Sequence, residues 1–209
     1  MKLRLEDIKD YRRVEEVTRE AFWNVHFPGC DEHLLINHLR DEKEFVKALD
    51  FVAVHGDEIV GNIVYVETKI IDSNNAEHKM LTFGPVSVLP EYQNKGIGSK
   101  LINHTITLAK EMGYKAILIY GDPEYYKRFG FKESKEYKIT NADKKYPAAL
   151  LVLELYPEAL TGIEGVFKEG EIYEVDADEL KEFEKMFIEK EKAFAKSQER
   201  FLELVNKFL

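Results

Sequence analysis

Apolar side chains near the start of the chain recur every three or four positions, which is the period of an α-helix. This spacing predicts an amphipathic helix over residues 8–22, after a short extended start at Leu3 and Leu5. The segment "FPGCDEH" ends that pattern, and Asp31 within it is expected to cap a second helix. The apolar positions assigned to the second helix continue as far as Leu49.

The period then changes to that of β-strands. The runs "FVAVH" and "EIVGNIVYVETKII" are rich in β-branched residues and are joined by "GDE", which predicts a hairpin. "KMLTFGPVSVL" predicts the next strand, and Gly84-Pro85 inside it indicates a bulge, because proline cannot donate to a strand ladder. A helix from Ser99 to Met112 follows, and Gly113 is expected to end it.

The pattern beyond this helix mixes strands with one short helix. "KAILIYG" predicts a buried strand, "PEYYKRFG" a short helix ended by Gly130, "FKES" an extended segment and "PAALLVLELY" a last strand. Residues 1–156 therefore form one expected domain with the order α-α-β-β-β-α-β-α-β. This is an α/β mixture around a central sheet and not a regular βαβ array.

Residues 157–209 are expected to form a mainly helical C-terminal extension. Apolar residues there repeat every seven positions, with Phe183 and Leu204 as partners: Leu180, Phe187, Phe194, Phe201 and Phe208. The pattern predicts one or two amphipathic helices that pack on the core of the same chain. A dimer contact or a lid over the active site is the alternative, and Ser197 could cap a separate last helix.

Composition narrows the classes of partner. The chain has 209 residues, 44% of them hydrophobic, and a formal net charge of −9. That charge argues against a nucleic acid or an anionic membrane as partner of the whole protein, because phosphate binding needs a basic surface. The charged N-terminus does not resemble a signal peptide, and no apolar run approaches the ~20 residues of a membrane span. With Cys30 as its one cysteine, the chain is expected to be cytoplasmic.

The stretch "VLPEYQNKGIGSKLI" places Gly96 and Gly98 between a predicted strand and a predicted helix. The first backbone N–H groups of a helix are unpaired and lie at the positive end of its dipole, so bare glycines there can admit an anion. The spacing matches neither a P-loop nor a dinucleotide-binding motif with three glycines. The pattern alone leaves two interpretations open, an anion site and a flexible helix cap.

Two motifs in this order resemble the GCN5-related N-acetyltransferase (GNAT) superfamily. "QNKGIG", from Gln93 to Gly98, is similar to its acetyl-CoA signature Q/R-x-x-G-x-G/A. "YKRFGF", from Tyr126 to Phe131, is similar to its Tyr-x-x-x-Gly-Phe segment. The resemblance extends over residues 3–156 and looks closest to the YhbS-like branch. It implies a mixed, mostly antiparallel sheet with a bulged and splayed strand, flanked by helices.

The resemblance also implies acetyl-CoA as co-substrate and no metal. The pantetheine arm would lie along the splayed strand and the pyrophosphate on backbone amides before and within the helix start, with Lys95 and Lys100 adding charge. The backbone amide of Val88 would polarise the thioester carbonyl. The implied cofactor-binding residues are Val86, Ser87, Val88, Gln93, Asn94, Lys95, Gly96, Ile97, Gly98, Ser99 and Lys100.

Tyr126 occupies the place of the tyrosine that commonly protonates the CoA thiolate in this family. The alternative is a core aromatic residue, and the neighbouring Tyr125 is the second choice for the catalytic role. The sequence departs from the family at Ile119, where many members carry a cofactor-contacting asparagine; only Asp122 and Glu124 follow as polar residues.

The sequence defines the residues that would bind and deprotonate the acceptor less clearly than it defines those for the cofactor. Four residues are candidates for a general base, although each is also explained as a solvated charge: Glu67, His78, Asp122 and Glu154. By likeness to the family, the first two helices and their loop would form the acceptor wall. Trp23, Phe27 and Glu32 could meet a substrate there, with Glu32 pairing a cationic amine.

Cys30 and His33 are expected to be structural, because nothing nearby in the sequence orients the histidine for a thiolate nucleophile. The histidines around them, His26, His33 and His38, do not have the spacing of a zinc site.

The expected function is transfer of an acetyl group from acetyl-CoA to the amine of a small molecule, by direct attack. Two alternatives stay open: a non-catalytic acyl-CoA-binding sensor or scaffold, and an acetyltransferase for protein lysines or N-termini. A homodimer is one option for the C-terminal helices.

Overall fold

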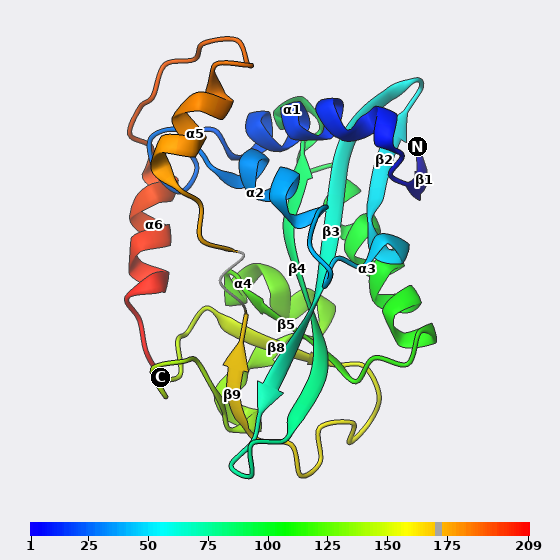
Figure 1. Cartoon of the computed structure of the whole chain (residues 1–209), viewed down its shortest axis with the longest axis vertical. Helices are drawn as coiled ribbons and strands as arrows, with labels where there is room; N and C mark the ends of the chain where they lie inside the picture. Colours follow the sequence, from blue (N-terminus) through cyan, green and yellow to red (C-terminus); the bar gives the residue numbers. More distant parts are fainter. Residues whose placement is uncertain (170–172) are drawn as a thin grey trace. The chain divides into compact units, whose positions relative to one another are not determined.

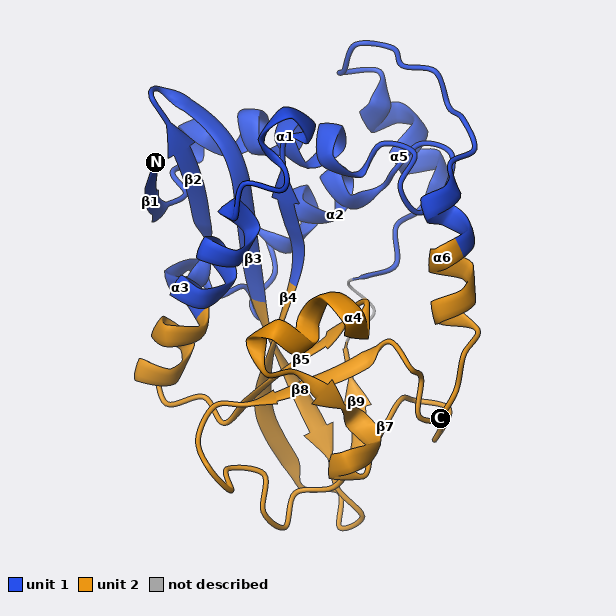
Figure 2. Cartoon of the chain, turned by 180° about the vertical axis from the view of Figure 1, so that it is seen from behind, with its two compact units in different colours: residues 1–65, 84–105, 171–199 blue, residues 66–83, 106–170, 200–209 orange. Residues whose placement is uncertain are grey.

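The structure is a computed structural model that describes residues 1–169 and 173–209 (Figure 1). It divides into two compact units (Figure 2). Unit 1 comprises residues 1–65, 84–105 and 171–199, and unit 2 comprises residues 66–83, 106–170 and 200–209. The strands β3 (Glu58–Ile71) and β4 (Glu77–Val88) and the helix α3 (Ile97–Glu111) contribute residues to both units.

In unit 1, the strands β1 (Lys2–Leu5), β2 (Phe51–His55) and β3 pair in that order, each antiparallel to its neighbour. The predicted hairpin is confirmed, and Gly56 takes the positive φ of its turn. The helices α1 (Tyr11–Phe22) and α2 (Glu32–Leu39) are confirmed as elements; α1 has a buried and a more exposed side, whereas no residue of α2 is exposed.

The expectation that the second helix reaches Leu49 is wrong. Helix α2 ends at Leu39, and Leu49 lies in a separate 3-10 helix, Lys47–Leu49. Just before it, the backbone N–H of Val46 donates to the carbonyl oxygen of Tyr65 on β3, at 2.9 Å. This bond ties the segment to the strand. Asp31 stands at the N-cap of α2, but its side chain makes no capping hydrogen bond.

Unit 2 is built on short strands. β4 pairs parallel to β5 at Leu81 and Ile117, β5 pairs antiparallel to β8, and β8 pairs antiparallel to β6. β9 pairs antiparallel to β3 and parallel to β7. The elements that complete the unit are β5 (Ala116–Tyr120), α4 (Pro123–Tyr126), β6 (Lys132–Glu133), β7 (Ile139–Thr140), β8 (Leu150–Glu154) and β9 (Gly165–Lys168). Strands β7 and β9 are absent from the sequence prediction, since neither is long enough to show a period.

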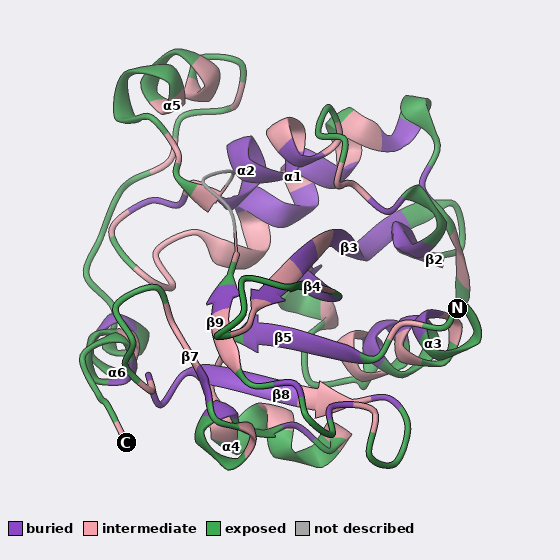
Figure 3. Ribbon diagram, turned by 60° about the horizontal axis from the view of Figure 1, so that its bottom comes forward, coloured by how far each residue is buried: buried purple, intermediate pink, exposed green. Residues whose placement is uncertain are grey.

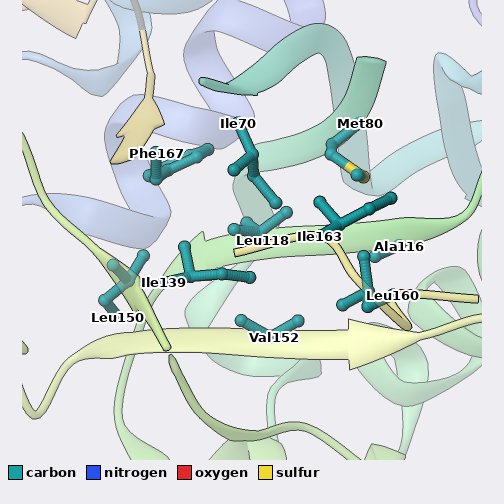
Figure 4. Close-up of a cluster of buried hydrophobic side chains, with 10 residues drawn as sticks. All are labelled: Ile70, Met80, Ala116, Leu118, Ile139, Leu150, Val152, Leu160, Ile163 and Phe167. Carbon is teal, nitrogen blue, oxygen red and sulfur yellow. The ribbon is translucent and has the colours of Figure 1, made fainter. Parts of the chain in front are cut away.

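The core of unit 2 is a cluster of ten buried side chains (Figure 4). They come from strands β3, β4, β5, β7, β8 and β9 and from the loop after β8: Ile70, Met80, Ala116, Leu118, Ile139, Leu150, Val152, Leu160, Ile163 and Phe167. Figure 3 shows most of β5 and the first part of β8 as buried. Because β9 supplies Phe167, residues after position 156 are part of this core, and the boundary predicted there stays a prediction.

The C-terminal extension contains two separate helices, α5 (Ala177–Glu184) and α6 (Lys196–Val205). Phe187 and Phe194 of the predicted seven-residue repeat lie between them, and Phe194 is 91% exposed. The repeat therefore does not form one continuous buried stripe. Ser197 lies inside the first turn of α6, and residues 170–172 of the extension lie outside the described residues. The predicted fold class, a mixed and mostly antiparallel sheet with flanking helices, is confirmed.

Candidate active site

The end of β4 leads into a turn that delivers the chain to helix α3 in unit 1. Along β4, Val86 and Val88 are half-buried, and Ser87 between them is buried. Ser87 Oγ donates to Thr18 Oγ1 at 3.2 Å, so its side chain is committed to the interior. Only the backbone of Ser87 is left to serve a ligand.

Gln93 closes the turn with both of its donors. Its backbone N–H donates to Pro90 O at 3.2 Å, and its side-chain Nε2 donates to Val88 O at 3.0 Å. The side chain therefore folds the loop back onto the end of β4. The run of uncommitted N–H groups begins at the next residue, Asn94.

Two residues with left-handed backbone, Asn94 (φ 58°) and Gly96 (φ 79°), shape the segment before α3. Within residues 1–169 and 173–209, the N–H groups of Asn94, Lys95 and Gly96 donate to no backbone carbonyl. A Cβ at Gly96 would have no heavy atom within 4 Å, so the surface above it is open. Free amides at the positive end of a 15-residue helix form a site for an anion.

The predicted cofactor-binding residues all lie in unit 1, and the lysines among them are exposed. Lys95 Nζ donates to Glu91 O at 2.7 Å and lies 5.2 Å from the ring centroid of Tyr92. The ammonium group is thus held at the carbonyl of Glu91 and near the Tyr92 ring. Ile97 is buried and anchors the first turn of α3, while Gly98 and Ser99 are half-buried.

In unit 2, Tyr126 lies at the end of the short helix α4. Its ring packs against Phe83 and Phe131, at centroid distances of 5.9 and 5.7 Å. A Cβ added to Gly121 would lie 2.4 Å from Tyr126 Cε2, so this ring position requires glycine at the end of β5. Sequence reasoning missed Gly121; its one signal was a glycine directly between a strand and a helix cap.

The hydroxyl of Tyr126 makes no hydrogen bond to any residue that the structure describes, and burial raises its pKa above the ordinary value. It therefore carries its proton at neutral pH and is available as a donor. A general acid must carry a proton and be able to donate it. The assignment of Tyr126 as that acid stays a prediction.

The four candidate bases are all engaged elsewhere. Glu67 accepts from Tyr114 at 2.6 Å, His78 lies 3.0 Å from Asp72, and Glu154 accepts from the backbone of Leu160 at 2.8 Å.

The fourth, Asp122, caps α4 through Glu124 N at 2.9 Å and bonds Arg200 at 3.2 Å. Burial alone would raise the pKa of Asp122, but these hydrogen bonds outweigh burial and lower it. A carboxylate held in this way is a poor proton acceptor.

The residues predicted for the acceptor wall are also in unit 1. Trp23 Nε1 donates to the carbonyl oxygen of Glu191 in the C-terminal extension, at 2.9 Å. Glu32 is buried and lies 2.8 Å from His26 Nδ1, so its carboxylate already has a partner. Phe27 is 36% exposed.

Cys30 and His33 are joined by a third residue that the sequence did not reveal. Cys30 Sγ lies 3.5 Å from His33 Nδ1, and Glu184 Oε1 of helix α5 lies 2.7 Å from His33 Nε2. The premise that nothing orients the histidine is therefore wrong. Burial nevertheless raises the pKa of the thiol and lowers that of His33 to about 4, so at neutral pH both groups are uncharged. A buried thiol without thiolate character is structural.

The described residues contain no group of three histidine, cysteine, aspartate or glutamate side chains that could hold a metal ion. The expectation of a metal-free protein stays a prediction. No helix in the described part of the chain combines the length and apolar character needed to cross a membrane.

Comparisons with known proteins agree with this geometry. Residues 48–133 match the family model for the acetyltransferase (GNAT) domain. The uncharacterized N-acetyltransferase YjhQ of Escherichia coli K12 is 28% identical over 142 residues, which cover 68% of this chain and 72% of YjhQ. The crystal structure of YhbS from Escherichia coli in complex with CoA matches with a TM-score of 0.72 and 22% identity, covering 82% of this chain and 91% of that one.

A GNAT family acetyltransferase from Brucella melitensis, solved in complex with acetyl-CoA, matches with a TM-score of 0.66 and 27% identity. The match covers 83% of this chain and 97% of that one. Residues 48–133 therefore match a GNAT domain, and the chain is similar to YhbS and YjhQ. The resemblance and the fold predicted from the two motifs are confirmed, and both motifs fall inside the residues matched by the family model.

Proposed function

We propose that this protein is an acetyl-CoA-dependent N-acetyltransferase that acts on the primary amine of a small molecule. The observation that carries the proposal is the run of uncommitted backbone N–H groups from Asn94 to Gly96 at the start of α3. The Brucella relative, which was solved with acetyl-CoA, supports the choice of ligand.

In this proposal, unit 1 binds the co-substrate. The amides of residues 94–99 hold the pyrophosphate, and the backbone of Val86, Ser87 and Val88 pairs with the pantetheine arm. The amide of Val88 donates to the thioester carbonyl oxygen, where negative charge develops during the reaction. Positive φ at Gly96 and the open space above it suit the close approach of a phosphate group.

Tyr126 supplies the proton for the departing thiolate in this proposal. The neutral amine attacks the thioester carbonyl directly, so that no acyl-enzyme forms. Tyr126 then donates its hydroxyl proton to the sulfur as the C–S bond breaks. The absence of a hydrogen-bond partner for this hydroxyl among the described residues supports the role.

The binding part is tested by calorimetry with acetyl-CoA and free CoA. Gly98→Glu places a carboxylate in the first turn of α3, where it would repel the pyrophosphate. We expect its affinity for acetyl-CoA to fall by about tenfold or more, a loss of ~1.4 kcal/mol or greater. Thr161→Glu, at an exposed position of unit 2, adds the same charge and should leave affinity unchanged.

The proposed binding site would be contradicted if the wild-type protein did not bind acetyl-CoA at millimolar concentration. It would also be contradicted if Gly98→Glu bound acetyl-CoA as tightly as wild type. Circular dichroism of both variants checks that the fold is intact.

A non-catalytic acyl-CoA sensor is the second candidate, and one observation favours it. Trp23 and Asn24, at the expected acceptor wall, both donate to the carbonyl oxygen of Glu191, so the C-terminal extension covers part of this wall. A screen of primary amines and lysine peptides with detection of released thiol separates the candidates. A sensor binds acetyl-CoA and releases no thiol with any amine, whereas a peptide-specific enzyme responds to the peptides alone.

A further inference from the structure

Three polar side chains form a hydrogen-bond network in the interior of unit 1. Thr18 lies on α1, Asn62 on β3 and Ser87 on β4, and none of the three is more than 1% exposed. Ser87 Oγ donates to Thr18 Oγ1 at 3.2 Å, and Thr18 Oγ1 donates to Asn62 Oδ1 at 3.2 Å. This Thr18 network therefore joins one helix to two strands, and Figure 2 shows all three segments in the colour of unit 1.

The Thr18 network is a costly feature of the core. A threonine hydroxyl inside a helix commonly donates to the carbonyl of the preceding turn, whereas that of Thr18 donates across to β3. Asn62 Nδ2 is buried and has no hydrogen-bond partner within residues 1–169 and 173–209. An unpaired buried amide destabilises the fold relative to an apolar side chain. Polar residues kept in a core at such a cost are expected where they serve the function.

Backbone contacts hold the end of β4 to β3 at the same place. Leu89 N donates to Val60 O at 2.9 Å. A Cβ added to Gly61 would lie 2.7 Å from Ser87 O, so the two backbones approach closely there and the position requires glycine. These contacts fix β4 within the sheet. The hydrogen bond from Ser87 to Thr18 supplies the link from β4 to helix α1.

Both elements that this bond joins carry parts of the proposed function. Val88, whose amide is assigned to the thioester carbonyl, directly follows Ser87. On α1, Thr18 stands five residues before Trp23 of the expected acceptor wall. Misplacing a reacting group by about 1 Å costs on the order of 10²-fold in rate. The spacing between α1 and the end of β4 therefore matters for the reaction.

We propose that Thr18 is a positioning residue that acts through Ser87 to hold the Val88 amide in place for the thioester carbonyl oxygen. This inference rests on the proposed function and deepens it. Asn62 Oδ1 accepts the Thr18 proton, which leaves the lone pairs of Thr18 Oγ1 for the Ser87 hydroxyl. The network moves no proton in this role, because it ends at an amide, which is not a base.

The test compares two substitutions of Thr18 with a matched control. Thr18→Val keeps the shape of the side chain and breaks both hydrogen bonds, whereas Thr18→Ser keeps the hydroxyl. The control is Thr105→Val, at a fully buried threonine of α3 in unit 1. Its hydroxyl donates to Leu101 O at 2.9 Å and lies 2.9 Å from Tyr65 Oη. This control accounts for the stability lost with any buried hydroxyl, which urea unfolding measures in each variant.

The readout is the ¹³C NMR resonance of acetyl-CoA labelled at its carbonyl carbon and bound without an acceptor. A hydrogen bond to the oxygen polarises the carbonyl and moves this resonance downfield. We expect the downfield shift in wild type, Thr18→Ser and Thr105→Val, and the loss of most of it in Thr18→Val. The dissociation constant for acetyl-CoA should stay within about threefold of wild type in all of them, because Thr18 lies outside the pyrophosphate site.

Ser87→Ala tests whether Thr18 acts through Ser87. This variant removes the same bond from its other end, so it should lose the carbonyl shift to the same extent as Thr18→Val. The double variant should lose no more than either single variant, because both remove one interaction. If Thr18→Val does not fold, Ser87→Ala carries the test, since it removes a single hydroxyl.

The outcomes separate the inference from the proposed function. A wild-type carbonyl shift in Thr18→Val or in Ser87→Ala overturns the role of Thr18 and leaves the proposed function standing. An equal loss of the shift in Thr105→Val also overturns it, because the effect is then one of general stability. Wild-type protein that binds acetyl-CoA without a downfield shift contradicts the role of the Val88 amide, and the inference with it. Wild-type protein that does not bind acetyl-CoA overturns both.

Discussion

At the scale of single residues, the proton donor is the most specific assignment. Tyr126→Phe removes only the hydroxyl and keeps the ring that packs against Phe83 and Phe131. We expect kcat to fall by about 10²-fold, since general acid catalysis contributes 10²–10⁴-fold, while acetyl-CoA affinity stays the same. Thiol-release kinetics and calorimetry measure the two quantities.

Tyr125→Phe decides between the two neighbouring tyrosines. Tyr125 is 36% exposed, and its ring makes an edge-to-face contact with Tyr126 at a centroid distance of 5.0 Å. If Tyr125→Phe lowers kcat and Tyr126→Phe does not, the acid is Tyr125. If neither variant changes kcat, Tyr126 serves packing alone.

A second prediction at this scale concerns Asp50, which is 2% exposed and lies beside Glu6 in unit 1. Burial, and then the hydrogen bond with Glu6, raise the pKa of Asp50. A carboxyl whose pKa is higher in the folded state stabilises the fold fully below its unfolded pKa of about 3.9. That contribution is lost as pH rises through the folded value. Asp50→Asn keeps a neutral donor toward Glu6, so it should gain stability over wild type as pH rises.

Urea unfolding of both proteins at about pH 5 and pH 9 measures this difference, and we expect Asp50→Asn to gain on the order of 1 kcal/mol relative to wild type between the two. If the difference in unfolding free energy between wild type and Asp50→Asn did not vary with pH, the raised pKa of Asp50 in the folded protein would be contradicted.

At the scale of elements, the carboxylate of Glu184 on helix α5 forms an ion pair with Arg19 on α1. Glu184 accepts from Arg19 Nε at 3.0 Å and from Arg19 Nη2 at 2.7 Å, and the Arg19 side chain is only 4% exposed. Burial acts to raise the pKa of Glu184, but Arg19 and His33 outweigh it and lower the pKa. The contact therefore stabilises the fold above the unfolded pKa of about 4.3 and is lost as pH falls.

Glu184→Gln leaves Arg19 buried without a counter-charge, and breaking such a pair costs about 3–5 kcal/mol when it is fully buried. Because Glu184 itself is 19% exposed, we expect a smaller loss, about 2 kcal/mol, with faster proteolysis of the segment between α5 and α6. Glu182→Gln, which affects only an exposed pair with Lys185, is the matched control. Equal proteolysis of both variants would show that the Arg19 pair does not hold the segment.

Elements with their own periodicity were predictable from the sequence, and elements that depend on partners were not. The long helix α3 and the hairpin of β2 and β3 carry a local pattern and a local stop. Strands β7 and β9 have two and four residues, and they exist because they pair with each other and β9 with β3. The sequence pattern placed Val46 in the second helix, whereas its backbone N–H bonds to Tyr65 on β3, a partner far along the chain.

The candidate site shows the same distinction between features set by a local sequence pattern and features set by distant contacts. The loop from Gln93 to Gly98 and the helix of Tyr126 were predictable because each is a short continuous motif. Gly121 was not, since it matters through its contact with the Tyr126 ring. The contact between Glu184 and His33 could not be predicted either, because the two residues are about 150 positions apart in the sequence.

At the scale of the whole molecule, two observations define the account. The chain has the fold of its GNAT relatives, and its unit 1 offers free amides at the start of a long helix. Because the net charge of the protein is −9, its overall electrostatic field does not attract an anion such as CoA. Binding of an anionic co-substrate must therefore come from this local site, which makes it dependent on a few backbone groups.

The measurement that tests this most directly is a ¹⁵N NMR titration of the whole chain with acetyl-CoA. The account predicts that the largest amide shifts occur at Asn94, Lys95, Gly96 and Gly98, and that they disappear in Gly98→Glu. Saturable shifts confined to other parts of the chain, with these four amides unchanged, would contradict it.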